Sequence, residues 1–268
     1  MMRIIIEEIK KNFKIMLSYP IEIFFWIVFP LLWVLPLIFQ GKAMVGGLRS
    51  SSFGNLSGTE EFIPYVLIGA IFSTYMFSAV WGMGSSFRDE MYFGTLEFIL
   101  SSPTPQYILL FAKAIYNTLL STIFVIFQVL VCVIFFGLHI SLFKIAPFLI
   151  ILLLLLIGLY GIGFFAAALT LLVKESHGLL HLFEYVLFLF SPIRYPVEVN
   201  PVTRAVSLFI PLTYALIVIR GILLNLEFNF LRNSIMLLII DMIILLLSIF
   251  TYAMIERSTR KKGTLAYY

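Results

Sequence analysis

Two histidines and a glutamate stand at helical spacing near residue 180, and these side-chain types are zinc ligands. In HGLLHLFE, His177, His181 and Glu184 are separated by four and three residues, so a helix would carry all three on one face. The order is not H-E-x-x-H, because Gly178 follows the first histidine, and no second cluster offers a general base. We therefore expect polar residues at the end of a helix and no metal site, with a metalloenzyme at these residues as an alternative.

Two carboxylates lie inside long apolar runs, at Glu184 and Asp241. Ionisable groups in such runs are costly to bury, and they commonly mark function or face an internal partner. We favour a structural ion pair of Asp241 with Arg220 or Arg232. A transporter that moves protons through Glu184 and Asp241 remains the alternative.

The composition places these residues in a membrane protein. Hydrophobic residues make up 62% of the chain and charged residues 12%, whereas soluble domains have about 45–50% and about 25%. The single cysteine, Cys132, excludes an intrachain disulfide. The net charge of +4 resides largely in basic ends, IKKNFK and RSTRKK, which suit an anionic lipid leaflet rather than nucleic acid.

The apolar pattern predicts an all-α fold with six transmembrane helices in one domain, residues 1–268. A helix needs about 20 apolar residues to cross a bilayer. The predicted spans are Ile21–Phe39, Phe62–Gly84, Tyr107–Phe136, Ile145–Val173, Leu179–Pro192 and Ser234–Ile255. More lysines and arginines fall inside than outside when both termini are cytoplasmic, so we expect a multi-pass protein of the cell membrane in that orientation.

Two further segments complete the predicted fold. Residues 1–18 have apolar positions at helical spacing with Lys10, Lys11 and Lys14 on the other side, which predicts an amphipathic helix at the membrane interface. Residues 193–225 are apolar but broken by prolines, which favours a re-entrant outer segment between spans five and six.

The charged stretch FRDEMYFGTLEFILSSPTP, residues 87–105, separates the second and third spans. Glu90, Gly94, Glu97 and Ser101 recur at steps of four, three and four, so a helix would carry them as one polar stripe. The prolines at 103 and 105 end that helix, because proline lacks the amide donor and disfavours a helical residue before it. The pattern predicts a short amphipathic helix at the inner face of the membrane.

This stretch resembles a signature of the type-2 ATP-binding-cassette exporter permeases, Glu…Gly-Thr-Leu-Glu…Ser-Pro…Lys. The matching positions are Arg88, Glu90, Gly94, Thr95, Leu96, Glu97, Ser102, Pro103 and Lys113. SPIRYPVEVNPVTRAVSLFIPLTYALIVIRGILL is similar to the proline-rich outer segment of the family, with Pro211, Leu212, Thr213, Tyr214 and Arg220 in place. Ile210 stands where the family often has asparagine.

The resemblance implies a permease that carries no ATPase of its own. A separate nucleotide-binding subunit would dock on residues 87–105, the coupling helix, and would hold the ATP and magnesium; this chain would need no cofactor and no metal. The chain has no G-x-x-x-x-G-K-[ST] phosphate loop, which agrees with that division. Pro211, Thr213, Tyr214 and Arg220 would form an outer gate. A second permease copy and membrane lipid would be partners, and a lipid, glycolipid, glycan or drug-like molecule would be exported.

Overall fold

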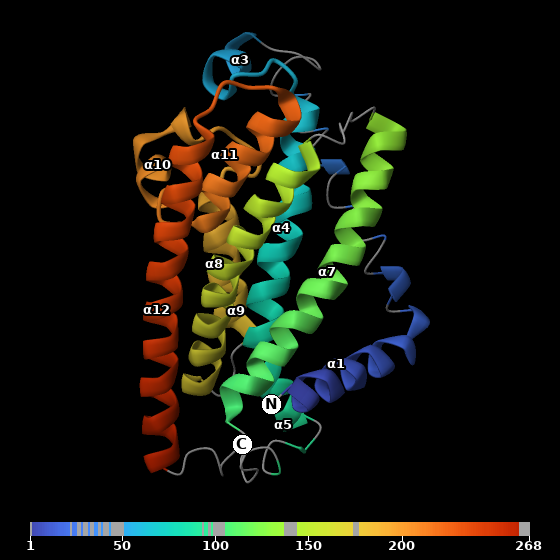
Figure 1. Cartoon of the computed structure of the whole chain (residues 1–268), viewed down its shortest axis with the longest axis vertical. Helices are drawn as coiled ribbons and strands as arrows, with labels where there is room; N and C mark the ends of the chain where they lie inside the picture. The colour runs from blue at the N-terminus through green and yellow to red at the C-terminus, as the bar shows by residue number, and fades with distance from the viewer. Residues whose placement is uncertain are drawn as a thin grey trace.

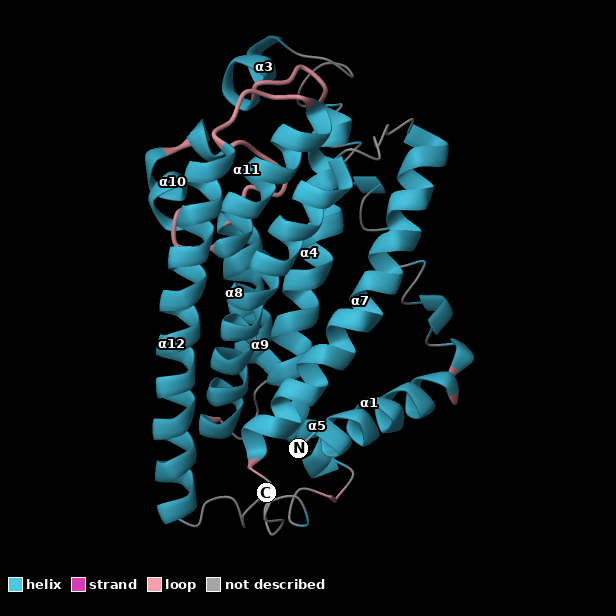
Figure 2. Ribbon diagram, viewed as in Figure 1, coloured by secondary structure: helices cyan, strands magenta, loops and turns pink. Residues whose placement is uncertain are grey.

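The computed structural model describes residues 2–21, 23–25, 28, 32, 35–36, 39, 43, 51–92, 94–95, 98, 105–136, 144–173 and 177–262. Helices make up nearly all of this part of the chain, and no β-strand occurs in it (Figures 1 and 2). In order they are α1 (Met2–Leu17), α3 (Ser51–Ser57), α4 (Phe62–Gly84), α5 (Ser86–Tyr92), α7 (Gln106–Phe136), α8 (Ile145–Leu172), α9 (His177–Phe190), the short 3-10 helix η2 (Val197–Val199), α10 (Pro201–Ser207), α11 (Pro211–Leu224) and α12 (Phe230–Lys262).

Four of the described helices, α4, α7, α8 and α12, are long and apolar enough to cross a membrane. They coincide with four of the predicted spans. The predicted fifth span corresponds to α9, which has only 14 residues. The predicted first span, Ile21–Phe39, falls mostly outside the described residues. The all-helical membrane fold is therefore confirmed, while the count of six spans stays a prediction.

Helix α8 lies between α4 and α12 and contacts both. Small residues allow this close packing, as they commonly do between membrane helices. A Cβ added at Gly161 would lie 2.9 Å from the backbone nitrogen of Leu245 on α12. A Cβ at Gly163 would lie 2.4 Å from the sulfur of Met83 on α4. These glycines are needed because neighbouring helices occupy the space of a side chain.

The proline-rich segment is broken, as predicted. Asn200 caps α10 by accepting a hydrogen bond from the amide of Val202 at 2.8 Å, and Pro201 begins the helix. Pro211 begins α11, which is bent by 98° from α10. Helix α11 then packs against α4, α8 and α12 and ends at Asn225, which has a left-handed φ of 55°. The segment thus returns a mostly buried helix into the bundle.

The helices share two ends (Figure 1). Helices α1 and α5, the start of α7 and the last turn of α12 lie at one end, here called the α5 end. Helix α3, α10 and the end of α11 lie at the opposite end. Residues near both termini therefore lie at the same end of the molecule as the predicted coupling helix.

Candidate coupling site

Helix α5 follows α4 after one residue and stops at a glycine. Gly94 has a φ of +67°, and the amide of Thr95 donates to the carbonyl of Glu90 at 2.9 Å. This is the Schellman arrangement, in which a left-handed residue, usually glycine, ends a helix and the next amide bonds back to its last turn. The Gly-Thr pair in the sequence therefore fixes the end of α5.

Glu90 is the centre of a charged cluster that joins three helices. Its carboxylate lies 3.4 Å from Nζ of Lys113 on α7 and 3.2 Å from Nζ of Lys11 on α1, and it accepts a hydrogen bond from the hydroxyl of Thr95. Lys113 also donates to the carbonyl of Ser86 at 3.1 Å. We call Glu90, Lys11, Lys113 and Thr95 the Glu90 cluster.

The surroundings of the cluster favour the charged forms of Glu90 and Lys11. Partial burial alone would raise the pKa of Glu90, but the hydrogen bond from Thr95 and the charges of Lys113 and Lys11 outweigh it, so the pKa lies below its ordinary value. Partial burial alone would lower the pKa of Lys11, but Glu8, 2.8 Å away, and Glu90 outweigh it and raise the pKa. Glu90 and Lys11 are therefore both ionised at neutral pH.

A small cavity of about 20 Å³ adjoins the cluster, lined by Glu8, Ser86, Phe87, Glu90, Leu109, Leu110 and Lys113. That volume holds roughly one water molecule. Three of the residues that line the cavity, Glu8, Glu90 and Lys113, have charged side chains. The cavity is a water-sized gap at the junction of α1, α5 and α7.

The predicted coupling residues have different surroundings. Glu90 is buried, and its carboxylate faces Lys11 of α1 and Lys113 of α7. Arg88 is half-buried, and Gly94 and Thr95 are exposed. Leu96, Glu97, Ser102 and Pro103 lie outside the described residues. The sequence interpretation missed Lys11 as a partner of Glu90, although its three-residue spacing from Glu8 signalled an acidic neighbourhood.

At the opposite end, Arg220 holds the broken segment together. Its guanidinium donates to the carbonyls of Pro192 at 2.7 Å, Ile193 at 2.9 Å and Tyr65 at 2.9 and 3.2 Å. It also lies 3.4 Å from the centre of the Tyr65 ring. A Cβ at Gly69 would lie 2.2 Å from the Ile193 carbonyl oxygen. One arginine on α11 thus joins the start of α4 to the chain that follows α9.

The other predicted outer-gate residues surround the bend before α11. The hydroxyl of Thr213 donates to the carbonyl of Ser207 at 2.7 Å, which links α11 to the end of α10. Pro211 and Tyr214 are buried in the same region. The structure therefore places Pro211, Thr213, Tyr214 and Arg220 on one buried helix.

Asp241 does not form the predicted ion pair. It is fully buried, and neither carboxyl oxygen has a hydrogen-bond partner in the part of the chain that the structure describes. Arg220 contacts backbone carbonyls instead. A Cβ at Gly158 would lie 2.0 Å from Asp241 Oδ1 and 2.8 Å from Pro211. The carboxyl therefore lies beside the first residue of α11, where the helix dipole is positive.

Glu184 contacts aromatic groups near the α5 end. Its carboxylate accepts a hydrogen bond from the indole of Trp81 at 2.9 Å and lies 3.5 Å from Nδ1 of His181. The rings of His177 and His181 are 6.1 Å apart. Within the described residues, no three His, Cys, Asp or Glu side chains are grouped so that they could hold a metal. The geometry gives the metalloenzyme alternative no support.

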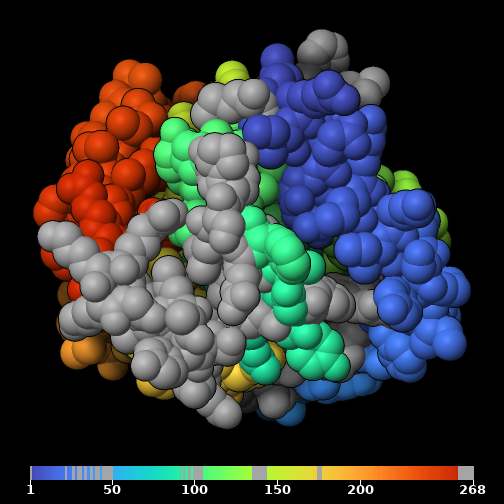
Figure 3. Space-filling view, turned by 90° about the horizontal axis from the view of Figure 1, so that it is seen from below, coloured from blue at the N-terminus to red at the C-terminus, as the bar shows by residue number. Residues whose placement is uncertain are grey.

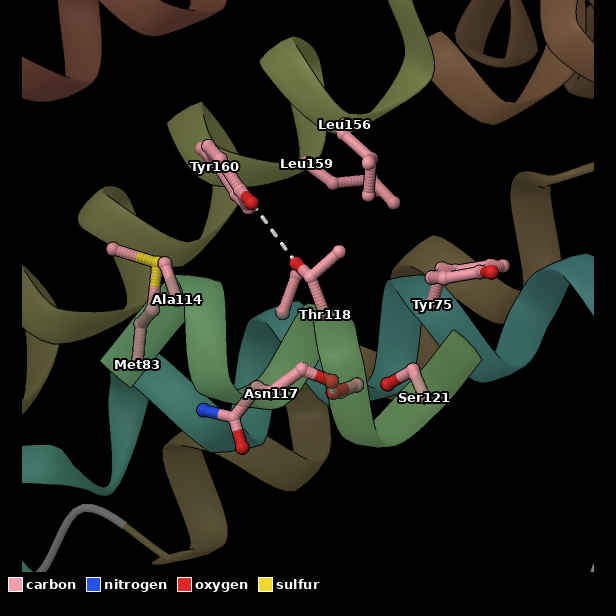
Figure 4. Close-up of a pocket in the computed structure, with 11 residues that line it drawn as sticks. Tyr75, Met83, Ala114, Asn117, Thr118, Ser121, Leu156, Leu159 and Tyr160 are labelled. Atoms are coloured by element: carbon pink, nitrogen blue, oxygen red, sulfur yellow. Dashed lines mark hydrogen bonds between the residues drawn. The ribbon is translucent and has the colours of Figure 1, made fainter. Parts of the chain in front are cut away.

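A polar seam runs between α4 and α7 within the membrane helices. The hydroxyl of Tyr75 on α4 donates to the hydroxyl of Thr122 on α7 at 3.1 Å. The hydroxyls of Thr118 on α7 and Tyr160 on α8 are bonded at 3.0 Å (Figure 4). Asn117 packs directly against Gly82, where an added Cβ would lie 2.1 Å from its amide nitrogen. The seam borders a cavity of about 10 Å³. That volume holds roughly one water molecule.

A comparison with known families now identifies the class of protein. A family model described as ABC-2 type transporter matches residues 10–224, most of the chain and both sites described above. No curated protein matches the chain. The chain belongs to the ABC-2 type transporter family and is a multi-pass membrane permease, a transport subunit and not a catalytic one. The family implies a partnering ATP-binding subunit.

Proposed function

We propose that this permease exports a lipid, glycolipid, glycan or drug-like molecule across the cell membrane. A separate subunit would hydrolyse ATP with magnesium and dock on α5, and a second permease copy would complete the complex. The observation that carries the proposal is the Glu90 cluster, which connects α5 to a membrane helix through a buried ion pair. Both termini, and α5 with them, would face the cytoplasm.

The Glu90 cluster suggests how movement of α5 reaches the membrane. Lys113 belongs to α7, which continues as a span, so displacement of Glu90 would displace the start of that helix. Lys11 belongs to α1, which we place at the membrane interface. The ATPase would contact Arg88 and the following Leu96, Glu97, Ser102 and Pro103, and Glu90 would transmit the motion.

At the other end, the broken segment would act as the outer gate. Arg220 connects α11 to α4 and to the chain after α9, so movement between α4 and α9 would act directly on α11. The proton-coupled alternative has less support. Within the described residues, no hydrogen bond links Asp241 to Glu184 or to another titratable group that could relay a proton.

The test is a mild-detergent purification of the tagged chain from its native host, followed by mass spectrometry and an ATPase assay. We expect a nucleotide-binding subunit to co-purify, and Glu97→Lys to abolish that association while the permease stays folded. Glu227→Lys is the matched control, because Glu227 is exposed at the opposite end. A folded permease that never retains an ATPase would contradict the proposal and return attention to proton coupling.

A further inference from the structure

Helix α1 has three chemically different sides, and the first contacts the protein. The residues of α1 that are partly buried are Ile4, Ile5, Glu8, Ile9, Asn12, Phe13 and Met16. Phe13 packs edge-on against Tyr116 of α7 at 4.9 Å, and Lys11 reaches Glu90 at the border of this side. Seen from the α5 end, α1 covers one side of the face beside α5 (Figure 3).

The second side is apolar and exposed. Met2 is 77% exposed, Ile6 45% and Leu17 67%. At 3.6 residues per turn these three side chains form one strip. An exposed apolar strip on a helix beside membrane spans fits the acyl-chain boundary of a bilayer.

The third side adjoins this strip and is basic. Arg3, Lys10 and Lys14 follow it on the helix surface and are exposed. Lys10 is paired with Glu7 at 3.0 Å, whereas Arg3 and Lys14 have no ion pair within the described part of the chain. An apolar strip bordered by cations matches a bilayer whose headgroups are negative, since each cation near such a surface gains attraction.

We propose that α1 binds anionic phospholipid headgroups through Arg3 and Lys14, and that this contact sets the position of α5 through Lys11 and Glu90. The proposal rests on the proposed function only for its second half. Lys11 is one helical turn from Lys14 and touches Glu90, so a lipid that fixes the basic side of α1 also fixes one partner of the coupling helix.

The apolar strip decides between a lipid and the acidic surface of a protein partner. A soluble ATPase would meet the basic side alone and leave Met2, Ile6 and Leu17 exposed to water. A bilayer covers the apolar strip and the basic side together, because the two are adjacent on one helix.

The first experiment measures lipid binding on the permease alone. Purified permease is titrated with phosphatidylglycerol in phosphatidylcholine nanodiscs, and bound phosphatidylglycerol is counted by mass spectrometry. We expect Arg3→Gln with Lys14→Gln to weaken binding about fivefold for each cation removed. Arg204→Gln with Arg232→Gln is the control, since both are exposed at the opposite end. Equal retention by the two double variants would overturn the proposal.

The second experiment uses the permease with its ATPase in the same nanodiscs. Phosphatidylglycerol should stimulate ATP hydrolysis, and Lys11→Gln should abolish the stimulation while lipid retention stays normal. Stimulation that survives Lys11→Gln would refute the link to Glu90. Loss of the ATPase from the Arg3 and Lys14 double variant, with lipid retention unchanged, would show that the basic side contacts protein. The first experiment uses no ATPase, so the phosphatidylglycerol binding it measures can be interpreted even if the proposed function is wrong.

Discussion

Removing the charge of Glu90 should uncouple α5 from α7 without unfolding the membrane helices. Glu90→Gln keeps the shape of the side chain but leaves the buried Lys113 with the Ser86 carbonyl at 3.1 Å and Asp89 at 4.0 Å. A hydrogen bond to a charged group contributes about 1.5–3 kcal/mol. Since Lys113 keeps one good acceptor, we expect a loss of about 2 kcal/mol, or about 30-fold in an equilibrium constant.

Two measurements check this value. Unfolding in mixed detergent micelles should show the loss of stability, and substrate-stimulated ATP hydrolysis should fall although the ATPase still co-purifies. Glu90→Gln combined with Lys113→Met should cost less than the sum of the single changes, because the double variant removes the buried cation together with its carboxylate partner. Asp89→Asn is the control and should cost less than about 1 kcal/mol, since Asp89 is half-exposed. Strict additivity of the two changes would refute the reasoning.

Three further predictions concern Gly158, Arg220 and the pH dependence of the Glu90 contribution. Gly158→Ala should destabilise the permease by about 1–3 kcal/mol, because the new Cβ meets Asp241 and Pro211; Gly178→Ala, which meets nothing within 4 Å, should not. Arg220→Lys should lower the melting temperature, because carbonyls lose their donors, and Arg204→Lys should leave it unchanged. The stability contributed by Glu90 should be present above its ordinary pKa of 4.5 and lost as pH falls through its lowered pKa. Melting curves of wild type and Glu90→Gln should therefore converge in acid and differ at neutral pH.

The spans were predictable because their signal is local. Long apolar runs have few alternatives to a membrane helix, and the predicted Phe62–Gly84 coincides with α4. The break before α11 was also predictable, since prolines 201 and 211 each begin a helix. In both cases the pattern of one segment was sufficient.

The contacts of single charged residues were not predictable in this way. Periodicity placed Glu90 on one polar stripe with Gly94, Glu97 and Ser101. Its carboxylate instead faces Lys113 and Lys11, which come from other helices. The expected ion pair of Asp241 with Arg220 or Arg232 was wrong for the same reason. Arg220 had a better alternative in three backbone carbonyls, those of Tyr65 at the start of α4 and of Pro192 and Ile193 after α9. No sequence pattern indicates that these carbonyls lie close together.

The position of Lys113 relates the coupling site to the polar seam. Lys113 lies one helical turn before Asn117, so a force on Glu90 enters α7 directly below the seam. There α7 contacts α4 through hydroxyl groups beside a water-sized cavity, and water can replace such bonds at little cost. The junction of α8 with α12 has no such freedom, because Gly161 packs against the backbone of Leu245. We therefore expect α7 to shift against α4 during transport, while α8 and α12 move as one body.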